Sequence, residues 1–239
     1  MVLLSIDLDI SDLIAEAEQA KVQGLLEEAR RLASEAILLL NRSEKAQLDW
    51  VEAAARILFD SFELSNDLFL HSNELNNLQT LFERLAPESL FLADTYGSLG
   101  IIDLDKGDLD ASEKMLEKAR RIQEHLAPES PSLSRTYVNL GIVYGEKGNL
   151  RKARQMQEKA LAIDKQLDPG SLRLADIYGN LGVICKREGD LKAAKEMQEK
   201  AREIQEHLAP ETLIIARTYG NLGVIHRIPR QLRGCTRKR

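Results

Sequence analysis

Residues 137–144 read Tyr-Val-Asn-Leu-Gly-Ile-Val-Tyr, and residues 178–185 read Tyr-Gly-Asn-Leu-Gly-Val-Ile-Cys. The second octet begins 41 residues after the first, and related octets occupy residues 96–103 and 219–226. A repeat on this scale is one supersecondary unit that cannot bury its apolar face alone, so its copies must stack. The repeat therefore predicts a solenoid.

Each copy of the repeat reads as two helices joined by a tight turn. Ser130 is a good N-cap, and apolar residues spaced by three and four predict a helix, helix A, to about Glu146. Gly148 suits the left-handed conformation that ends a helix, and Asn149 then caps helix B, predicted over about residues 150–167. The same cap sites recur at Ser89, Ser171 and Thr212 before helix A and at Asp108 and Asp190 before helix B.

The octet 137–144, followed by the small residues Ala153 and Ala160 in helix B, resembles the tetratricopeptide repeat, with tyrosine in place of the usual tryptophan. The resemblance places Gly141 and Gly182 where helix A meets helix B. The family's usual period is about 34 residues. The longer period here is similar to the repeats of kinesin light chains, Leu-Gly-Asn-rich mitotic adaptors and bacterial signalling proteins. HEAT-type repeats have a compatible length but lack this Leu-Gly pattern. The Asn-Leu-Gly triplets that strengthen the match lie at 139–141, 180–182 and 221–223.

The resemblance implies an all-α chain, an α-α superhelix of helix-turn-helix repeats. Residues 89–227 form the array, with three full repeats and helix A of a fourth. Residues 1–88 fit two degenerate repeats, which we expect to cap the solenoid. In these copies Ala17 and Gly24 occupy the close-contact and turn positions, whereas Phe59 falls where glycine is expected and should hold its two helices further apart.

Residues 228–239 do not continue the fourth repeat. They are strongly basic, and codons compatible with residues 229–237, read one base later, can encode Arg-Gly-Asn-Tyr-Glu-Ala-Ala-Arg-Glu, a good start for helix B. We therefore expect an out-of-frame tail. The alternatives are a basic tail that binds nucleic acid or a membrane and a natural solvated end.

Without a regular helix B, the last helix A has no cover for its apolar face. Leu222, Val224 and Ile225 are then expected to be partly exposed. Because repeat proteins need a polar terminal cap for solubility, the sequence predicts self-association through this end.

Composition narrows the classes of function. Residues 227–239 carry +6, so residues 1–226 carry −11 of the net charge of −5, which argues against nonspecific nucleic-acid binding. No apolar run reaches the roughly 18 residues of a membrane span, and the N-terminus lacks the basic region of a signal peptide. Cys185 and Cys235 offer no disulfide framework. We expect a cytoplasmic protein with neither nucleic acid nor membrane as partner.

Motifs of catalysis are missing from the sequence. It contains no phosphate loop, zinc-ligand spacing, nucleophile elbow or kinase motif. His125 and His207 share one repeat position near the end of helix B, where a cation suits the helix dipole. The sequence therefore predicts no enzyme, no cofactor and no metal site.

The resemblance places the A helices on the concave surface, where a partner would bind. Asn139, Asn180 and Asn221, with Ser98 in the first copy, form a ladder that can donate to and accept from an extended peptide backbone. Hydrogen bonding between repeats is the alternative role of these amides. Charged residues that would select the peptide lie one turn earlier at Asp94, Arg135, Asp176 and Arg217, and one turn later at Asp105, Lys186 and Arg187. The apolar groove positions are Ile101, Ile142, Val183 and Val224.

These features predict a non-catalytic scaffold that binds a protein or extended peptide in the concave groove. The alternative is the sensor or regulatory arm of a larger signalling enzyme whose catalytic domain lies beyond the break. A downstream reading frame encoding such a domain would separate the two hypotheses.

Overall fold

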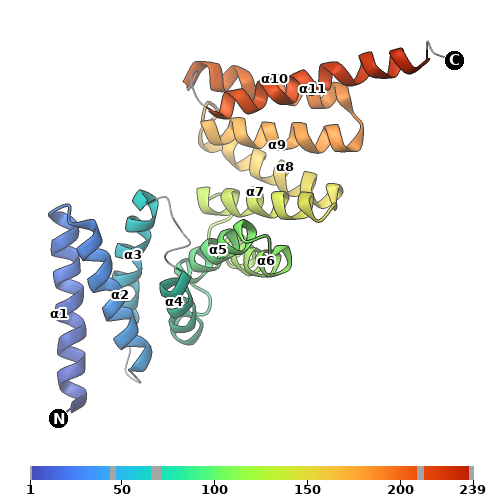
Figure 1. Ribbon diagram of the computed structural model, residues 1–239. Coiled ribbons are helices and arrows are strands. Elements are labelled where there is room, and N and C mark those ends of the chain that lie inside the picture. The colour runs from blue at the N-terminus through green and yellow to red at the C-terminus, as the bar shows by residue number, and fades with distance from the viewer. Residues whose placement is uncertain (1, 44–46, 66–71, 209–212, 237–239) are drawn as a thin grey trace. The chain divides into compact units, whose positions relative to one another are not determined.

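The computed structural model describes residues 2–43, 47–65, 72–208 and 213–236, and within these ranges every regular element is an α-helix (Figure 1). The elements are α1 Val2–Val22, α2 Leu26–Arg42, α3 Leu48–Ser65, α4 Ser72–Leu85, α5 Leu90–Asp105, α6 Leu109–Leu126, α7 Pro131–Glu146, α8 Leu150–Leu167, α9 Leu172–Glu188, α10 Leu191–Leu208 and α11 Leu213–Thr236. Where the connection between two helices is described, as between α5 and α6 or between α7 and α8, it is a short turn, as the repeat predicts.

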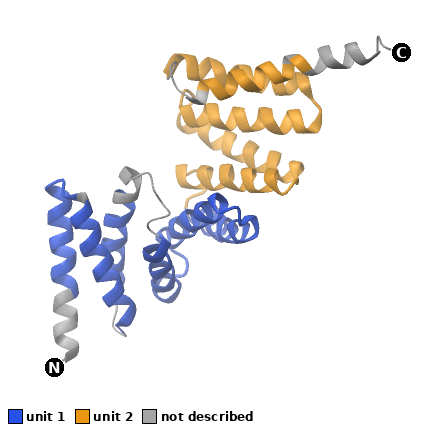
Figure 2. Cartoon of the chain, viewed as in Figure 1, with its two compact units in different colours: residues 1–126 blue, residues 127–239 orange. Residues whose placement is uncertain are grey.

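The chain divides into two compact units, residues 1–126 and residues 127–239 (Figure 2). The first contains α1 to α6 and the second contains α7 to α11. This division falls after the first full repeat, whereas the sequence places the start of the regular array at residue 89. We describe each unit by itself.

The predicted caps and turns define the helix ends. The hydroxyls of Ser89, Ser130 and Ser171 accept hydrogen bonds from backbone N–H groups three residues later, at 3.1–3.3 Å. Before the B helices, Asp108, Asn149 and Asp190 accept in the same way. The glycines of these turns adopt φ of +79° to +88°, a conformation that residues with a Cβ rarely take. The predicted cap at Thr212 lies outside the described residues.

The repeat glycines lie where helix A meets helix B, which confirms the expectation from the resemblance. A Cβ placed on Gly141 would lie 2.5 Å from Nε2 of Gln157, and one on Gly182 would lie 2.5 Å from Nε2 of Gln198. Each of these glutamines is buried and donates a hydrogen bond to a carbonyl of helix A. A larger residue would have to displace the buried glutamine, so this close approach of two helices favours glycine.

Of the two degenerate N-terminal repeats, the first forms a closely packed pair of helices, α1 and α2. Gly24 has φ of +77°, and Ala17 is buried in the core that α1 and α2 share. The second pair, α3 and α4, is looser: α3 packs chiefly on α2, and α4 packs chiefly on α5. Phe59 lies partly buried in this core, and its bulk at the glycine position accounts for the separation.

The last helix differs from the prediction. Helix A was expected to end near residue 227, but α11 runs without interruption from Leu213 to Thr236, through Pro229. The left-handed glycine that stops α9, Gly189, is replaced by Arg230 in this copy, so the stop signal is missing. Residues 237–239 of the predicted tail lie outside the described residues.

The exposure expected for α11 is also corrected in part. Leu222 and Ile225 are only 8% and 3% exposed, whereas Val224 is 40% exposed. Ile225 packs with Cys185 of α9 and Ala194 of α10, so the preceding repeat covers this side of α11. The apolar face toward the preceding repeat is therefore buried, and only the side that a following helix B would cover stays open.

Candidate peptide-binding face

In the second unit the A helices α7, α9 and α11 are neighbours, because α9 contacts both of the others. On α9 the residues Asp176, Asn180 and Arg187 are spaced by four and seven, so they lie on one side of the helix. Asn139 on α7 and Asn221 on α11 occupy the same repeat position as Asn180. We call the side that carries these three asparagines the A-helix face. Ser98 holds this position on α5 in the first unit.

The amides of the A-helix face remain available to a ligand. Asn139, Asn180 and Asn221 are each partly exposed, as is Ser98. Within the described ranges, no side-chain hydrogen bond joins any of the three asparagines to another residue. Hydrogen bonds from the following helix B hold the backbone next to Asn139 and Asn180. The Gln157 side chain donates to the carbonyl oxygen of residue 138 at 3.0 Å, and the Gln198 side chain donates to that of residue 179 at 2.9 Å.

The charged residues of this face are largely engaged with one another. Arg217 of α11 reaches a carboxylate oxygen of Asp176 on α9, at 3.3 Å. Burial raises the pKa of Asp176 above its ordinary value, and the Arg217 guanidinium opposes that rise in part. The pair therefore links two A helices while holding a half-buried carboxylate on the face.

Arg187 forms a second link between A helices. Its Nη1 donates to the carbonyl oxygen of Gly145 at the end of α7, at 2.8 Å, and lies 3.9 Å from a carboxylate oxygen of Glu146. Lys186 is partly buried and, being one residue earlier, lies about 100° around the helix. Arg135 is exposed and forms no ion pair with another described residue of its unit. In the second unit, these two cations are the charges of the predicted set that form no ion pair with a described residue.

The four predicted apolar positions of the groove are not equally exposed to solvent. Ile101, Ile142 and Val183 are partly buried, and Val224 is exposed. Those of the second unit give the A-helix face apolar surface beside its amides, which suits an extended peptide with alternating side chains.

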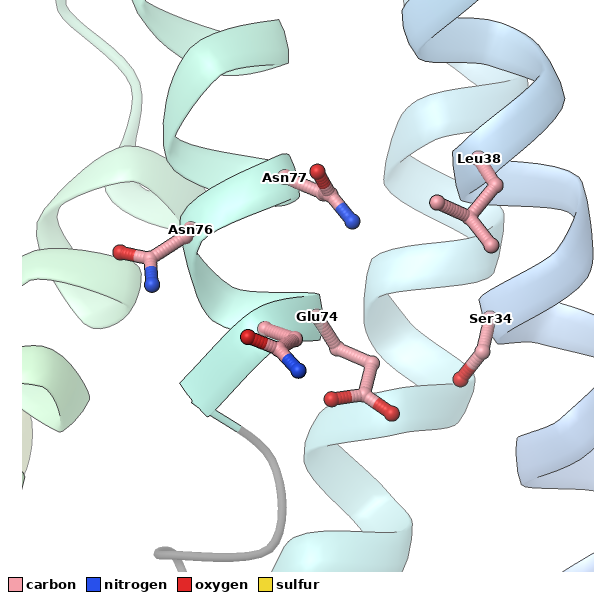
Figure 3. Close-up of a pocket in the computed structure, with 6 residues that line it drawn as sticks. Ser34, Leu38, Glu74, Asn76 and Asn77 are labelled. Carbon is pink, nitrogen blue, oxygen red and sulfur yellow. The ribbon is translucent and has the colours of Figure 1, made fainter.

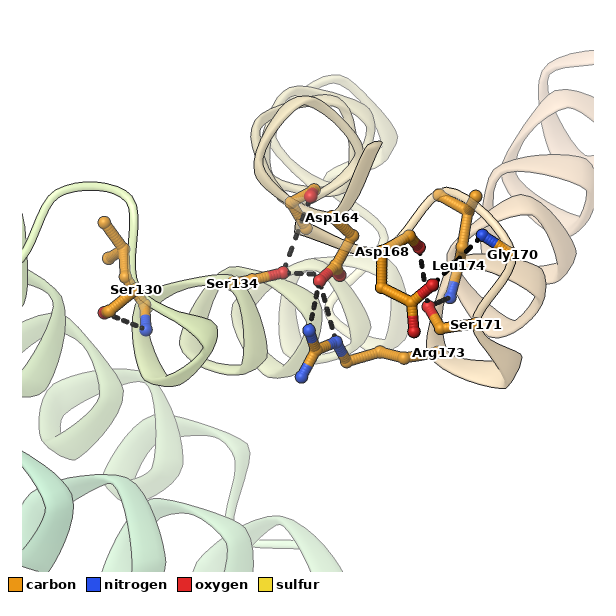
Figure 4. Close-up of polar contacts among 10 residues, drawn as sticks. Ser130, Ser134, Asp164, Asp168, Gly170, Ser171, Arg173 and Leu174 are labelled. Atoms are coloured by element: carbon orange, nitrogen blue, oxygen red, sulfur yellow. Dashed lines mark hydrogen bonds and ion pairs between the residues drawn. The ribbon is translucent and has the colours of Figure 1, made fainter. Parts of the chain in front are cut away.

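Sequence reasoning missed a buried charge cluster in the second unit (Figure 4). Asp164 of α8 is fully buried, and its carboxylate accepts a hydrogen bond from the Ser134 hydroxyl of α7 at 2.7 Å. The same carboxylate forms an ion pair with Arg173 of α9, whose Nη2 lies 2.5 Å from Oδ1 of Asp164. The signal was present, because the other copies carry glutamine at this position, Gln123 and Gln205. The cluster ties three helices together and offers no open coordination or reaction site.

A pocket in the first unit was also missed. It lies between α2 and α4 and has a volume of about 480 Å³ (Figure 3). Five of its six lining residues carry polar side chains; the six are Ser34, Leu38, Asn73, Glu74, Asn76 and Asn77. Amides and a single carboxylate can bind a polar group, but they make no nucleophile–base pair.

The described residues were also compared with the requirements of a metal site and of a membrane-spanning helix. Within residues 2–43, 47–65, 72–208 and 213–236, no group of three or more His, Cys, Asp or Glu side chains is placed to hold a metal ion. Across those same ranges, every helix falls short of the length and apolarity needed to cross a membrane. His125 and His207 are exposed near the ends of α6 and α10.

Comparison with known proteins identifies the repeat. Tetratricopeptide repeat profiles match residues 91–166 and 175–207. No curated protein matches the sequence.

Solved structures agree on the fold, an α-α superhelix of helix-turn-helix repeats. BtubC (BKLC) from P. vanneervenii is 23% identical with a TM-score of 0.65, over 91% of this chain and 83% of that one. A putative kinesin light chain from Podosopora anserina with nearly identical TPR-like repeats is 18% identical with a TM-score of 0.59, over 84% of this chain and 97% of that one. YrrB, described as a TPR protein with an unusual peptide-binding site, is 18% identical with a TM-score of 0.53, over 87% of this chain and 90% of that one.

Proposed function

Because tetratricopeptide repeat profiles match residues 91–166 and 175–207, we propose that the chain is a non-catalytic scaffold that binds an extended segment of a partner protein along the A-helix face. The observation that carries this proposal is the state of Asn139, Asn180 and Asn221. They recur at 41 residues and are partly exposed, and their side-chain amides form no hydrogen bond within the described ranges.

A side-chain amide both donates and accepts, so a row of amides can bind a peptide backbone with little dependence on sequence. Charged neighbours on the same face, Asp176, Arg187 and Arg217, are held in links between helices. We infer that they fix the spacing of the A helices, whereas the amides contact the peptide. Arg135 and Lys186 then favour acidic side chains in the segment.

The likeness to YrrB supports this reading, since that protein is described by its peptide-binding site. The hydrogen bonds that hold Gln157 and Gln198 against helix A add a physical reason. They rigidify the backbone next to Asn139 and Asn180, and a rigid binding face loses less entropy on association.

The proposal is tested by selecting peptides from a displayed library on the full chain and measuring their affinity by calorimetry. Changing Asn139→Ala and Asn180→Ala together should weaken the selected peptides about tenfold or more, at about 0.5–1.5 kcal/mol for each hydrogen bond lost. The melting temperature should stay nearly constant, because neither amide bonds to its own chain.

A matched control changes Gln155→Ala and Gln166→Ala, two exposed amides on α8 away from the A-helix face. This control should bind the selected peptides as the original chain does. A double asparagine variant with unchanged affinity, or one that loses several degrees of stability while affinity is kept, would contradict the proposal.

A further inference from the structure

The repeated tyrosine of helix A has different charged neighbours in different copies of the repeat. At Tyr96 the hydroxyl donates to Oε1 of Glu83, at 2.5 Å. Lys118 completes this group, with Nζ 3.2 Å from the same oxygen and 4.5 Å from the centre of the tyrosine ring. The first unit thus builds a Tyr–carboxylate–Lys site from its own residues.

The same carboxylate position is filled at the end of the second unit. The hydroxyl of Tyr219 donates to Oε1 of Glu206, at 2.5 Å. Glu206 stands three repeats after Glu83, and Tyr219 stands three repeats after Tyr96. A carboxylate that accepts from this tyrosine is therefore a recurrent part of the repeat.

At Tyr178 the carboxylate is replaced by a cation. The residue two repeats after Glu83 is Lys165, and the residue two repeats after Lys118 is Lys200. Their Nζ atoms lie 5.9 and 5.8 Å from the centre of the Tyr178 ring. Among the described residues, none hydrogen-bonds to the Tyr178 hydroxyl or forms an ion pair with Lys165. The donors of the site are present, and the acceptor is missing.

We propose that Tyr178, Lys165 and Lys200 bind a side-chain carboxylate of an acidic partner segment, in the place where the neighbouring repeats hold their own glutamate. The tyrosine hydroxyl donates one hydrogen bond to it, and the two ammonium groups supply charge-assisted contacts. Three helices, α8, α9 and α10, bring these groups together, so the site forms only in the stacked repeat.

The charges around Lys165 and Lys200 indicate which of the two lysines interacts more strongly with the ligand carboxylate. Lys200 already contacts Glu196 of its own helix at 2.8 Å, and Glu203 adds a second negative charge nearby. Asp164, next to Lys165 in sequence, is held by Arg173 and Ser134. Lys165 is exposed, so it is the main electrostatic contact of the ligand, and Lys200 contributes less.

This site is separate from the A-helix face. Tyr178 and Asn180 are two residues apart on α9, which rotates them by about 200° around the helix axis. A peptide on the amides and a carboxylate at Tyr178 therefore approach different sides of the helix, and each proposal can fail without the other.

The test titrates the full chain with an acetylated, amidated hexaglutamate peptide at about 0.15 M salt, where the Debye length is about 8 Å, and follows the ring signals of Tyr178 by NMR. A saturable shift is expected. Lys165→Glu restores the glutamate of the other repeats and should weaken binding of the peptide about tenfold or more, because a charge-assisted contact is replaced by repulsion between two carboxylates. Tyr178→Phe should weaken it several-fold, by loss of one donor.

The matched control is Lys152→Glu, which makes the same charge change beside another tyrosine of the unit, with Nζ 4.7 Å from the Tyr144 ring centre. It should leave the affinity within about twofold, since a distant surface charge is screened by salt. Circular dichroism melts confirm that each variant folds. The proposal is overturned if Lys152→Glu weakens binding as much as Lys165→Glu does, if Tyr178 does not shift, or if only inorganic phosphate shifts it.

Discussion

Gly182 and Gly223 occupy the same position of the same Asn-Leu-Gly triplet, yet the structure surrounds them differently. A Cβ on Gly182 would lie 2.5 Å from Gln198 of α10, whereas a Cβ on Gly223 would meet no atom within 4 Å. The tyrosines four residues earlier differ in the same way, with Tyr178 9% exposed and Tyr219 49% exposed. One motif therefore specifies a covered surface in α9 and an open one in α11.

The difference shows which contacts the motif itself decides. Leu181 and Leu222 are both buried, although, of α9 and α11, only α9 is followed by a helix B in the described part of the chain. The glycine side is covered only by the helix B that follows. The sequence of helix A prepares a contact, and the next helix determines whether that contact forms. Substitutions that act differently on α9 and α11 can sharpen or break this comparison.

The largest effect is expected where α9 is tied to the helix before it. Arg173→Leu leaves the fully buried Asp164 carboxylate with Ser134 as its remaining partner. Loss of one partner of a buried ion pair should cost about 3–5 kcal/mol of the free energy of unfolding. Urea unfolding followed by circular dichroism measures this cost.

The corresponding contact before α11 joins neutral groups, with the Thr218 hydroxyl donating to Gln205 at 2.8 Å. Thr218→Val should cost only about 1 kcal/mol. The double change Asp164→Gln with Arg173→Ser copies Gln123 and Ser132, which hold the same two positions one repeat earlier, and should recover most of the stability. Equal costs at the two junctions would show that the buried charge has no special role.

The next largest effect is expected at Gly182 and Gly223, where the same substitution should change the free energy of unfolding in opposite directions. Gly182→Ala forces a methyl group against the buried Gln198 side chain and should destabilise by about 1–3 kcal/mol. Gly223→Ala meets open space and should stabilise by about 0.5–1 kcal/mol, because alanine favours a helix interior over glycine. Thermal melts of both variants decide the matter, and destabilisation by Gly223→Ala would mean that its helix side is covered.

The smallest effect is expected at the residue that covers Gly182. The Oε1 atoms of Gln157 and Gln198 are buried and form no hydrogen bond in the described parts of the chain. In the first full repeat, Leu116 fills this position against Gly100. Gln198→Leu should therefore change stability by less than about 1 kcal/mol, since the lost hydrogen bond is offset by removal of an unsatisfied oxygen. A loss of several kcal/mol would show that the amide is essential to the contact.

Most of the fold could be predicted because its signals are local. A serine cap, a left-handed glycine and small residues at fixed spacing determine where α7 and α8 begin, end and touch. The long α11 could not be predicted in this way, because Pro229 reads as a helix breaker. The helix continues although Pro229 lacks a backbone N–H, because this copy lacks the glycine that ends α9.

The site was predictable only as positions along helix A. The repeat identified Asn139 and Asn180, but not that Arg187 and Asp176 are held by neighbouring helices, since those links cross repeats. The Asp164 cluster and the altered charge at Tyr178 depend on departures from the repeat. Such departures gain meaning only when the structure shows which residues they face.

The proposed peptide binding depends most directly on the side-chain amides of the A-helix face. The decisive measurement is an NMR titration of the side-chain NH₂ signals of Asn139 and Asn180 with a peptide selected on this chain. We predict that both signals shift and saturate with the affinity measured by calorimetry, while those of Gln155 and Gln166 on α8 do not move. Saturating binding with both asparagine signals unchanged would contradict the account.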